Sequence, residues 1–188
     1  MNKTFAHWRT VDLIVAAVLA VASGVIFVAW NSLYVPLSIG LSGLTPGFVA
    51  ILDGVWLIGG LLVALVVRRP GAAVLGEVIA STVSAIIGNQ WGFTVLILGV
   101  AQGLAMEYGF RLMRRTKVDF FVVAVAGAMG GLVQGLLEFV YWYPANGPVF
   151  AVVYVTSAIA SGAILGAGLS VLLVRALSKT GILATFGR

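Results

Sequence analysis

The chain has 188 residues, of which 61% are hydrophobic and only 9% are charged. Soluble domains typically carry about 25% charged residues, so a soluble fold of this composition would expose a large apolar surface to water, and a membrane protein is predicted. The absence of cysteine excludes disulfides and thiol chemistry. The single histidine, His7, precedes the first apolar stretch, which excludes a zinc site built from His and Cys.

Six apolar stretches are predicted to cross the bilayer as helices, since a span needs roughly 20 apolar residues. In chain order they are Val11–Trp30, Gly47–Val67, Gly71–Ile87, Phe93–Met113, Phe120–Val140 and Val149–Leu177. The third is short, and the sixth is long enough to tilt or to begin with an irregular segment. The sequence therefore predicts an all-α, integral membrane protein, with a single six-helix transmembrane domain over residues 1–188.

The basic residues lie on alternate connections between these stretches. All eleven occur before the first stretch, between the second and third, between the fourth and fifth, or at the end of the sixth: Lys3, Arg9, Arg68, Arg69, Arg111, Arg114, Arg115, Lys117, Arg175, Lys179 and Arg188. The connections at 32–45, 88–91 and 141–148 have none. The positive-inside rule therefore predicts cytoplasmic termini and three outer loops. It also accounts for the net charge of +5 without a nucleic-acid partner.

Aromatic residues gather at the predicted outer ends of the spans. Four of the five Trp residues lie there, together with several Tyr residues. An interfacial aromatic belt is one interpretation, but such belts usually occupy both faces of the membrane. The outer bias favours a cavity open to the outside, with Trp56, Trp91, Tyr141 and Trp142 as its stacking surfaces.

Four acids, Asp53, Glu77, Glu107 and Glu138, lie within predicted spans. An ionisable group at such depth is costly and marks a functional site by default. Glu107 stands four residues before Arg111, so an intrahelical ion pair is an alternative role for it. Asp53 and Glu138 lie in the outer halves of their spans, where no Lys or Arg occurs. These two acids are expected to be protonated, hydrogen-bonded, or available to a cationic ligand.

Aromatic rings beside a carboxylate suit a flat organic cation. The rings offer stacking and cation–π attraction, and the acid offers a charge-assisted hydrogen bond to an amine. Glu138 is predicted to be the anionic partner, with Glu77 reaching a ring amine from below. Asn89 and Gln102 are predicted to supply orienting hydrogen bonds, and Glu107 is a further candidate.

Small residues recur at every fourth position of four spans, a pattern that lets membrane helices approach closely. Packing within the chain is one interpretation, and docking onto another membrane protein is the alternative. The sequence has no nucleotide-binding phosphate loop, no Ser–His or Cys–His pair within the spans and no carboxylates at metal-ligand spacing. No catalysis, cofactor or metal is therefore predicted, and uphill transport would draw energy from a partner or an ion gradient.

Three segments resemble YkoE-type proteins. Arg68 to Glu77 reads RRPGAAVLGE, which is similar to the (R/K)KPGAALxxE segment of that family, and QGLAME at Gln102 to Glu107 and GVW at Gly54 to Trp56 are also similar. YkoE-type proteins are substrate-binding S components of energy-coupling factor (ECF) transporters. They are linked to thiamine or its hydroxymethylpyrimidine precursor.

The resemblance implies a subunit of a prokaryotic plasma membrane that captures a vitamin from outside. It would associate with a transmembrane coupling subunit and two cytoplasmic ATPases. In related S components small residues of the first helix contact the coupling subunit, and Ala16 and Ala20 are the matching positions. Two alternatives stay open: a proton-coupled exporter of organic cations that uses Glu77 or Glu107 as proton carrier, and a non-transporting scaffold built on the small-residue faces.

Overall fold

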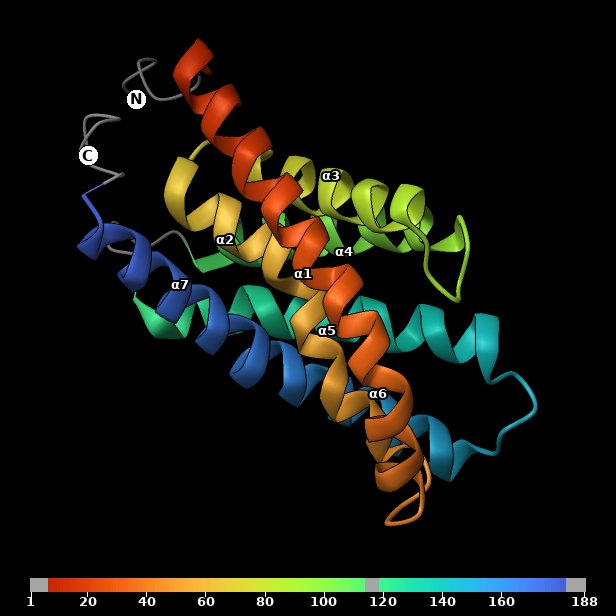
Figure 1. Ribbon diagram of the computed structural model, residues 1–188. Helices are drawn as coiled ribbons and strands as arrows, with labels where there is room; N and C mark the ends of the chain where they lie inside the picture. The colour runs from red at the N-terminus through yellow and green to blue at the C-terminus, as the bar shows by residue number, and fades with distance from the viewer. Residues whose placement is uncertain (1–6, 114–118, 182–188) are drawn as a thin grey trace.

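The computed structural model describes residues 7–113 and 119–181, and over these residues it is a bundle of helices without strands (Figure 1). Five helical stretches are long and apolar enough to cross a membrane: Thr10–Leu41, Phe48–Val67, Thr94–Met113, Phe120–Trp142 and Pro148–Lys179. A sixth, Ala72–Ile87, is apolar but has only 16 residues. The predicted all-α membrane fold is confirmed.

The first helix is longer than predicted. Helix α1 runs over Thr10–Ser42 and has 33 residues, so the predicted connection at 32–45 is wrong over most of its length. Pro36 lies inside α1, although a proline removes a helical hydrogen bond. Membrane helices tolerate proline where other groups satisfy the freed backbone. At 1.5 Å per residue α1 is about 50 Å long, so it must tilt or protrude from the bilayer core.

The second span forms the centre of the bundle. It begins as a 3₁₀ helix, η2 (Phe48–Leu57), and continues as α2 (Ile58–Val67). In the most apolar stretch of 18 residues of this span, 78% is buried inside the protein, against 33% to 44% in the other four long spans. A helix that is apolar all round is expected at such a position. Asp53 is therefore surrounded by protein on every side, and its exposed fraction is 0%.

The third span packs closely against its neighbours. Helix α3 (Ala72–Ile87) contacts α1, α2 and α4 (Thr94–Met113). A Cβ added at Gly76 would lie 2.5 Å from the Gly59 carbonyl oxygen and 2.7 Å from Cβ of Val63. The small residues of α3 are thus used inside the chain, where they let its backbone approach α2.

The last two spans meet through a second set of small residues. Helix α5 covers Phe120–Trp142, and the sixth span consists of α6 (Pro148–Ser161), a π-helical turn η3 (Gly162–Gly166) and α7 (Ala167–Lys179). A Cβ added at Gly127 or Gly131 would collide with the backbone of Gly162 or Ala158. The irregular part of the sixth span lies in its middle, and its start is a regular helix with Pro148 in the first turn.

Ala16 and Ala20 do not lie on the surface. Both are 0% exposed and belong to an apolar core cluster that includes Val63 and Ala80. The prediction that they contact a partner subunit is therefore wrong, because a side chain with no exposed surface cannot reach another chain. The outward side of α1 carries larger residues such as Val18, which is 62% exposed.

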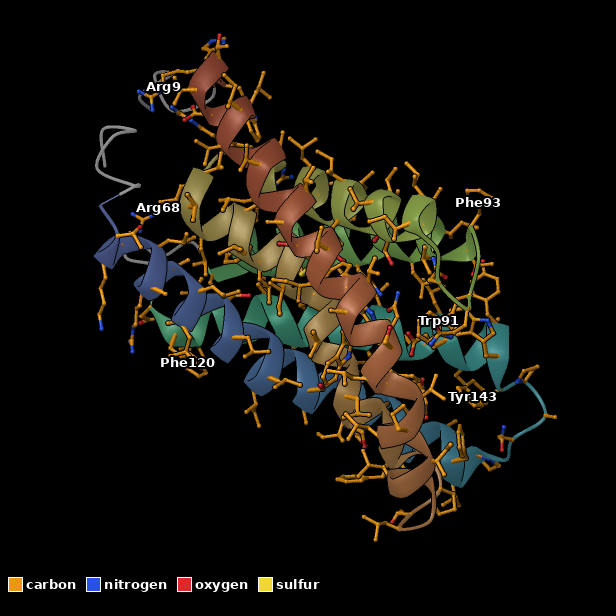
Figure 2. All side chains as sticks on the ribbon, in the orientation of Figure 1. Arg9, Arg68, Trp91, Phe93, Phe120 and Tyr143 are labelled. Atoms are coloured by element: carbon orange, nitrogen blue, oxygen red, sulfur yellow. The ribbon has the colours of Figure 1, made fainter. Side chains whose placement is uncertain are left out.

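The two ends of the bundle differ in chemistry. Arg9 and Arg68 lie at one end, and Trp91, Phe93 and Tyr143 lie at the other (Figure 2). We call these the cationic end and the aromatic end. Helix α1 begins and α7 ends at the cationic end (Figure 1), which agrees with the charge pattern of the sequence.

Candidate functional site

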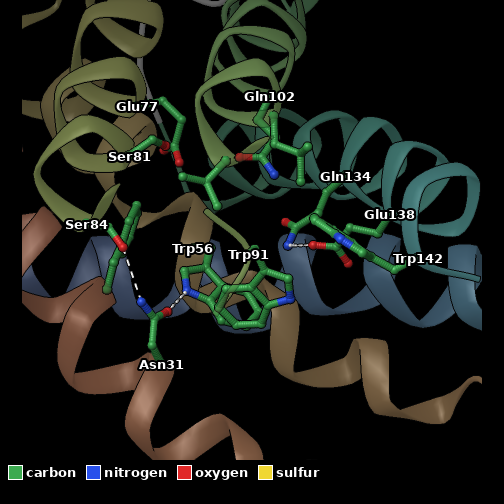
Figure 3. A pocket seen from close by; sticks show the side chains of 13 residues that line it. Asn31, Trp56, Glu77, Ser81, Ser84, Trp91, Gln102, Gln134, Glu138 and Trp142 are labelled. Atoms are coloured by element: carbon green, nitrogen blue, oxygen red, sulfur yellow. Dashed lines mark hydrogen bonds between the residues drawn. The ribbon is translucent and has the colours of Figure 1, made fainter. Parts of the chain in front are cut away.

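A cavity lies between α1, η2, α3, α4 and α5 near the aromatic end (Figure 3). It encloses about 420 Å³, counting the part open to solvent, which is within the usual range for small-molecule sites. The centre of a water molecule can occupy only about 40 Å³ of it. A vitamin-sized ligand therefore requires side chains to move aside. The lining residues are Phe27, Asn31, Trp56, Glu77, Ser81, Ser84, Trp91, Val95, Leu98, Gln102, Gln134, Glu138 and Trp142.

Trp91 lies close to three other aromatic rings at the cavity. It lies in the connection between α3 and α4, and its ring centre is 5.0 Å from that of Trp56, 5.6 Å from that of Tyr34 and 6.4 Å from that of Trp142. The contacts with Trp56 and Tyr34 are edge-to-face, a favoured geometry for aromatic pairs.

Asn31 fixes another part of this wall. Its Oδ1 accepts a hydrogen bond from Trp56 Nε1 at 2.9 Å, and its Nδ2 donates to Ser84 Oγ at 3.1 Å (Figure 3). This pair of bonds ties α1, η2 and α3 together and sets the plane of the Trp56 indole. Sequence reasoning missed Asn31 because the first helix was expected to end at Trp30.

Glu77 presents a free acceptor to the cavity. It is 0% exposed, and its Oε2 accepts a hydrogen bond of 2.7 Å from the backbone N–H of Gly60. Glycine is needed there because a Cβ at Gly60 would collide with Met106 Cε and would lie 2.9 Å from the Ala73 carbonyl oxygen. The other oxygen, Oε1, has no hydrogen-bond partner among the described residues. This acid is thus held in place through one oxygen and leaves the other for a ligand.

Glu138 is more fully engaged than predicted. Its Oε1 accepts from Gln134 Nε2 at 3.0 Å, and its Oε2 accepts from the Tyr154 hydroxyl at 2.6 Å. Since the amide nitrogen of Gln134 donates to Glu138, the amide oxygen is left over, and it has no partner among the described residues. Gln134 and Glu138 are one turn apart on α5 and both line the cavity (Figure 3).

Six of the nine predicted ligand residues line this cavity: Trp56, Glu77, Trp91, Gln102, Glu138 and Trp142. Two of the other three lie beside it. Asn89 Oδ1 accepts from the backbone N–H of Trp91 at 2.8 Å, so it shapes the connection. Tyr141 is 42% exposed and contacts the Trp142 ring from outside the lining.

The third, Glu107, lies at the cationic end. It accepts hydrogen bonds from the backbone N–H groups of Gly71 at 2.8 Å and Ala73 at 3.3 Å, and it pairs with Arg111 at 3.4 Å. The structure thus places Glu107 outside the ligand site and in the alternative role of ion-pair partner. Its carboxylate satisfies the N-terminal N–H groups of α3, as expected for an acid at a helix N-terminus.

Several lining residues were not predicted as ligand contacts, among them Ser81, Ser84 and Gln134. The signal for the two serines was present in the sequence, because they stand four and seven residues after Glu77 and so share its face of a helix. Gln134 stands four residues before Glu138, so these two residues also share one face of a helix. Phe27, Val95 and Leu98 had no such signal, since they look like any apolar residue of a span.

The chain was compared with known proteins. A family model described as ABC-type cobalt transport system, permease component, matches residues 11–133. The chain belongs to this family. The description names cobalt, but among the residues described in the structure no group of three or more His, Cys, Asp or Glu side chains could hold a metal ion.

Two relatives sharpen this placement. The chain is 29% identical over 178 residues to the "Putative HMP/thiamine permease protein YkoE" of Bacillus subtilis (strain 168), with 94% of this chain and 87% of that protein covered. The crystal structure of an S-component of an ECF transporter superposes with a TM-score of 0.83 at 24% identity, covering 94% of this chain and 89% of that one. The resemblance to YkoE-type proteins is confirmed, and the chain is a membrane transporter subunit with the S-component fold.

Proposed function

We propose that this chain captures thiamine or its hydroxymethylpyrimidine precursor at the outer face of the membrane. In this proposal it is the substrate-binding subunit of an importer whose coupling subunit and ATPases are separate chains. The observation that carries the proposal is Glu77 Oε1, a fully buried acceptor with no hydrogen-bond partner in residues 7–113 and 119–181, which faces a cavity lined by three Trp rings. A flat ligand with a ring amine satisfies both features.

The polar groups of the cavity favour a ligand that donates hydrogen bonds. Glu77 Oε1 and Gln134 Oε1 are both acceptors, and neither receives a hydrogen bond from the part of the chain that the structure describes. A buried acceptor left unsatisfied costs about 1–3 kcal/mol, so an amino group placed between them gains more here than in water. The thiamine and hydroxymethylpyrimidine named for the Bacillus subtilis relative both carry an aminopyrimidine ring. The positively charged thiazolium of thiamine additionally suits the Trp faces.

Mass spectrometry of small molecules that copurify with the protein tests the ligand directly. We expect thiamine or hydroxymethylpyrimidine in the extract of the wild type and a reduced amount in that of Glu77→Gln. Titration with thiamine should quench tryptophan fluorescence, because Trp56, Trp91 and Trp142 line the cavity. A neutral vitamin that lacks an amino group, found at stoichiometric level in the wild type, would contradict the proposal.

The energy source and orientation need separate tests. A cysteine at Asn146 should react with an impermeant thiol reagent in intact cells, and one at Ser178 should not. Both residues are exposed, but Asn146 lies in the connection between α5 and α6, whereas Ser178 lies in the last turn of α7, which ends at the cationic end (Figure 1). In liposomes, vitamin uptake should require the partner subunits and ATP. Transport by the chain alone, driven by a proton gradient, would instead support the proton-coupled exporter.

A further inference from the structure

Asp53 is a buried acid for which the proposed vitamin binding has no use. It lies on η2 in the middle of the bundle and does not line the cavity. It is 0% exposed, and no N–H or hydroxyl group of the described residues donates a hydrogen bond to either of its carboxyl oxygens. An ionised carboxylate without a partner is very costly at such a site.

The side chain next to Asp53 is another acid. The carboxyl groups of Asp53 and Glu138 are close enough for a side-chain hydrogen bond. Two ionised carboxylates offer acceptors only, so that bond requires a proton on one of them. Two adjacent buried carboxyls also resist ionising together, because their charges repel. The geometry of the pair therefore calls for one shared proton.

No cation faces this pair among the described residues. The titratable groups around it are hydroxyls from three elements and one further acid across the cavity: Tyr34 on α1, Tyr143 after α5, Tyr154 on α6 and Glu77 on α3. The ion pairs of the described residues lie at the cationic end, at Arg9, Arg69 and Arg111. A positive charge near Asp53 and Glu138 must therefore come from a proton or from a ligand.

A row of hydroxyl groups connects the pair with the aromatic end. The Tyr154 hydroxyl donates a hydrogen bond of 2.6 Å to Glu138. The ring centre of Tyr143 lies 5.0 Å from that of Tyr154. The Tyr143 hydroxyl lies beside the hydroxyls of Tyr154 and Tyr34. Tyr143 is only partly buried and lies at the surface of the aromatic end (Figure 2). Burial raises the pKa of the Tyr143 hydroxyl, which therefore keeps its proton and can act as a donor.

We propose that Asp53 and Glu138 share one proton in the empty protein, and that an organic cation entering the cavity displaces this proton to the outside along Tyr154 and Tyr143. The identity of the cation rests on the function proposed above. One positive charge enters the site and one leaves: the protonated pair and the cation become a complex with two carboxylates and one free proton. Glu138 lines the cavity and therefore interacts with the ligand, whereas Asp53 does not line the cavity and acts through Glu138.

Linkage fixes the sign of the resulting pH dependence. If binding releases a proton, added protons oppose binding by the same coupling free energy. Affinity for thiamine then rises with pH, by up to about tenfold per pH unit where a full proton is released. Replacement of Asp53 by Asn removes the shared proton and leaves a hydrogen-bond donor beside Glu138, so the dependence becomes weaker.

Calorimetry measures the released proton. Thiamine is titrated into the wild type, Asp53→Asn and Asp12→Asn at one pH in two buffers that differ in ionisation enthalpy. Because the ligand is the same throughout, any proton carried by thiamine itself cancels in the differences between proteins. We expect Asp53→Asn to release fewer protons than the wild type, and Asp12→Asn, altered at the cationic end, to match it. Equal release by the wild type and Asp53→Asn overturns the proposal.

A second measurement uses infrared spectroscopy, with Asp53→Asn to assign the band to the pair. Infrared difference spectra of the wild type with and without thiamine should show the loss of a protonated-carboxyl C=O band on binding. An empty protein that lacks such a band contradicts the shared proton. If thiamine does not bind at all, the proposed function fails instead, and a protonated-carboxyl band that the empty wild type shows and Asp53→Asn lacks still establishes that the pair holds a proton.

Discussion

The buried acids at the two ends of the bundle are in opposite situations. At the cationic end Asp12 pairs with Arg9 at 3.2 Å and with Arg69 at 2.8 Å, and Glu107 binds Arg111 and two backbone N–H groups. Toward the aromatic end, Glu77 has one unpartnered oxygen, and Asp53 and Glu138 have no basic neighbour among the described residues.

This contrast separates two uses of a buried acid in a membrane. Asp12 and Glu107 join α1 and α4 to the segment Arg69 to Ala73, and Trp8 adds a hydrogen bond of 3.1 Å from its indole nitrogen to the Pro70 carbonyl. Their negative charge is neutralised inside the protein, so they stabilise the fold. Glu77 keeps one oxygen without a hydrogen bond from the described residues, and Asp53 and Glu138 have no cation beside them there, so a proton or an external group must supply the missing partner.

The largest effect on ligand binding is expected from Glu77→Gln. The change removes the charge from an acid whose Oε1 has no hydrogen-bond partner among the residues described in the structure, so a charge-assisted hydrogen bond of about 1.5–3 kcal/mol to the ligand is lost. Thiamine affinity should fall roughly tenfold to 150-fold, as measured by quenching of tryptophan fluorescence. The amide can still accept the Gly60 N–H, so the thermal unfolding temperature should stay close to that of the wild type. Unchanged affinity would remove Glu77 from the site.

A smaller loss is expected from Glu138→Gln. Both oxygens of Glu138 already accept hydrogen bonds from Gln134 and Tyr154, so its main role toward a ligand is to orient the Gln134 amide and to supply long-range charge. We expect thiamine affinity to fall by about tenfold or less, which corresponds to about 1.4 kcal/mol. A loss larger than that of Glu77→Gln would make Glu138 the direct partner, as the sequence alone suggested.

Trp91→Phe tests whether the ring at the mouth contributes through stacking. Phenylalanine keeps the apolar contact with Trp56 but has a weaker π face for a cation, and cation–π contacts are worth about 0.5–1 kcal/mol at partly exposed sites. Affinity for thiamine should fall by a few-fold, and affinity for uncharged hydroxymethylpyrimidine should fall less. Equal losses for both ligands would show that the ring only fills space.

The smallest effect on binding is expected from Glu107→Gln at the cationic end. The change weakens the contacts with Arg111 and the α3 N-terminus, which should lower the stability of the detergent-solubilised protein by about 1–3 kcal/mol. Thiamine affinity, measured on protein that remains folded, should equal that of the wild type. A clear loss of affinity would mean that the two ends are coupled through α3, which carries Glu77 in its middle.

The sequence was sufficient for the features that the bilayer itself imposes. A hydrocarbon core needs long apolar helices and excludes bare charge, so spans, fold class and the cationic end could be predicted from hydropathy and from the positions of Lys and Arg. Depth alone also identified Glu77 and Glu138 as acids worth explaining, and both line the cavity. YkoE-type segments placed the chain among its relatives.

Tertiary structure decided how those acids are used. Glu77 and Glu107 are both single acids within apolar spans, and the sequence offered only the Arg111 ion pair as a distinction. Contacts between helices distant in the chain show that Glu77 binds Gly60 and faces a cavity, while Glu107 binds Gly71. The same holds for Ala16 and Ala20, whose spacing indicates a small-residue face without saying which helix covers it. Hydropathy reports the preference of each residue for lipid or water, whereas partners in space depend on how all six spans pack together.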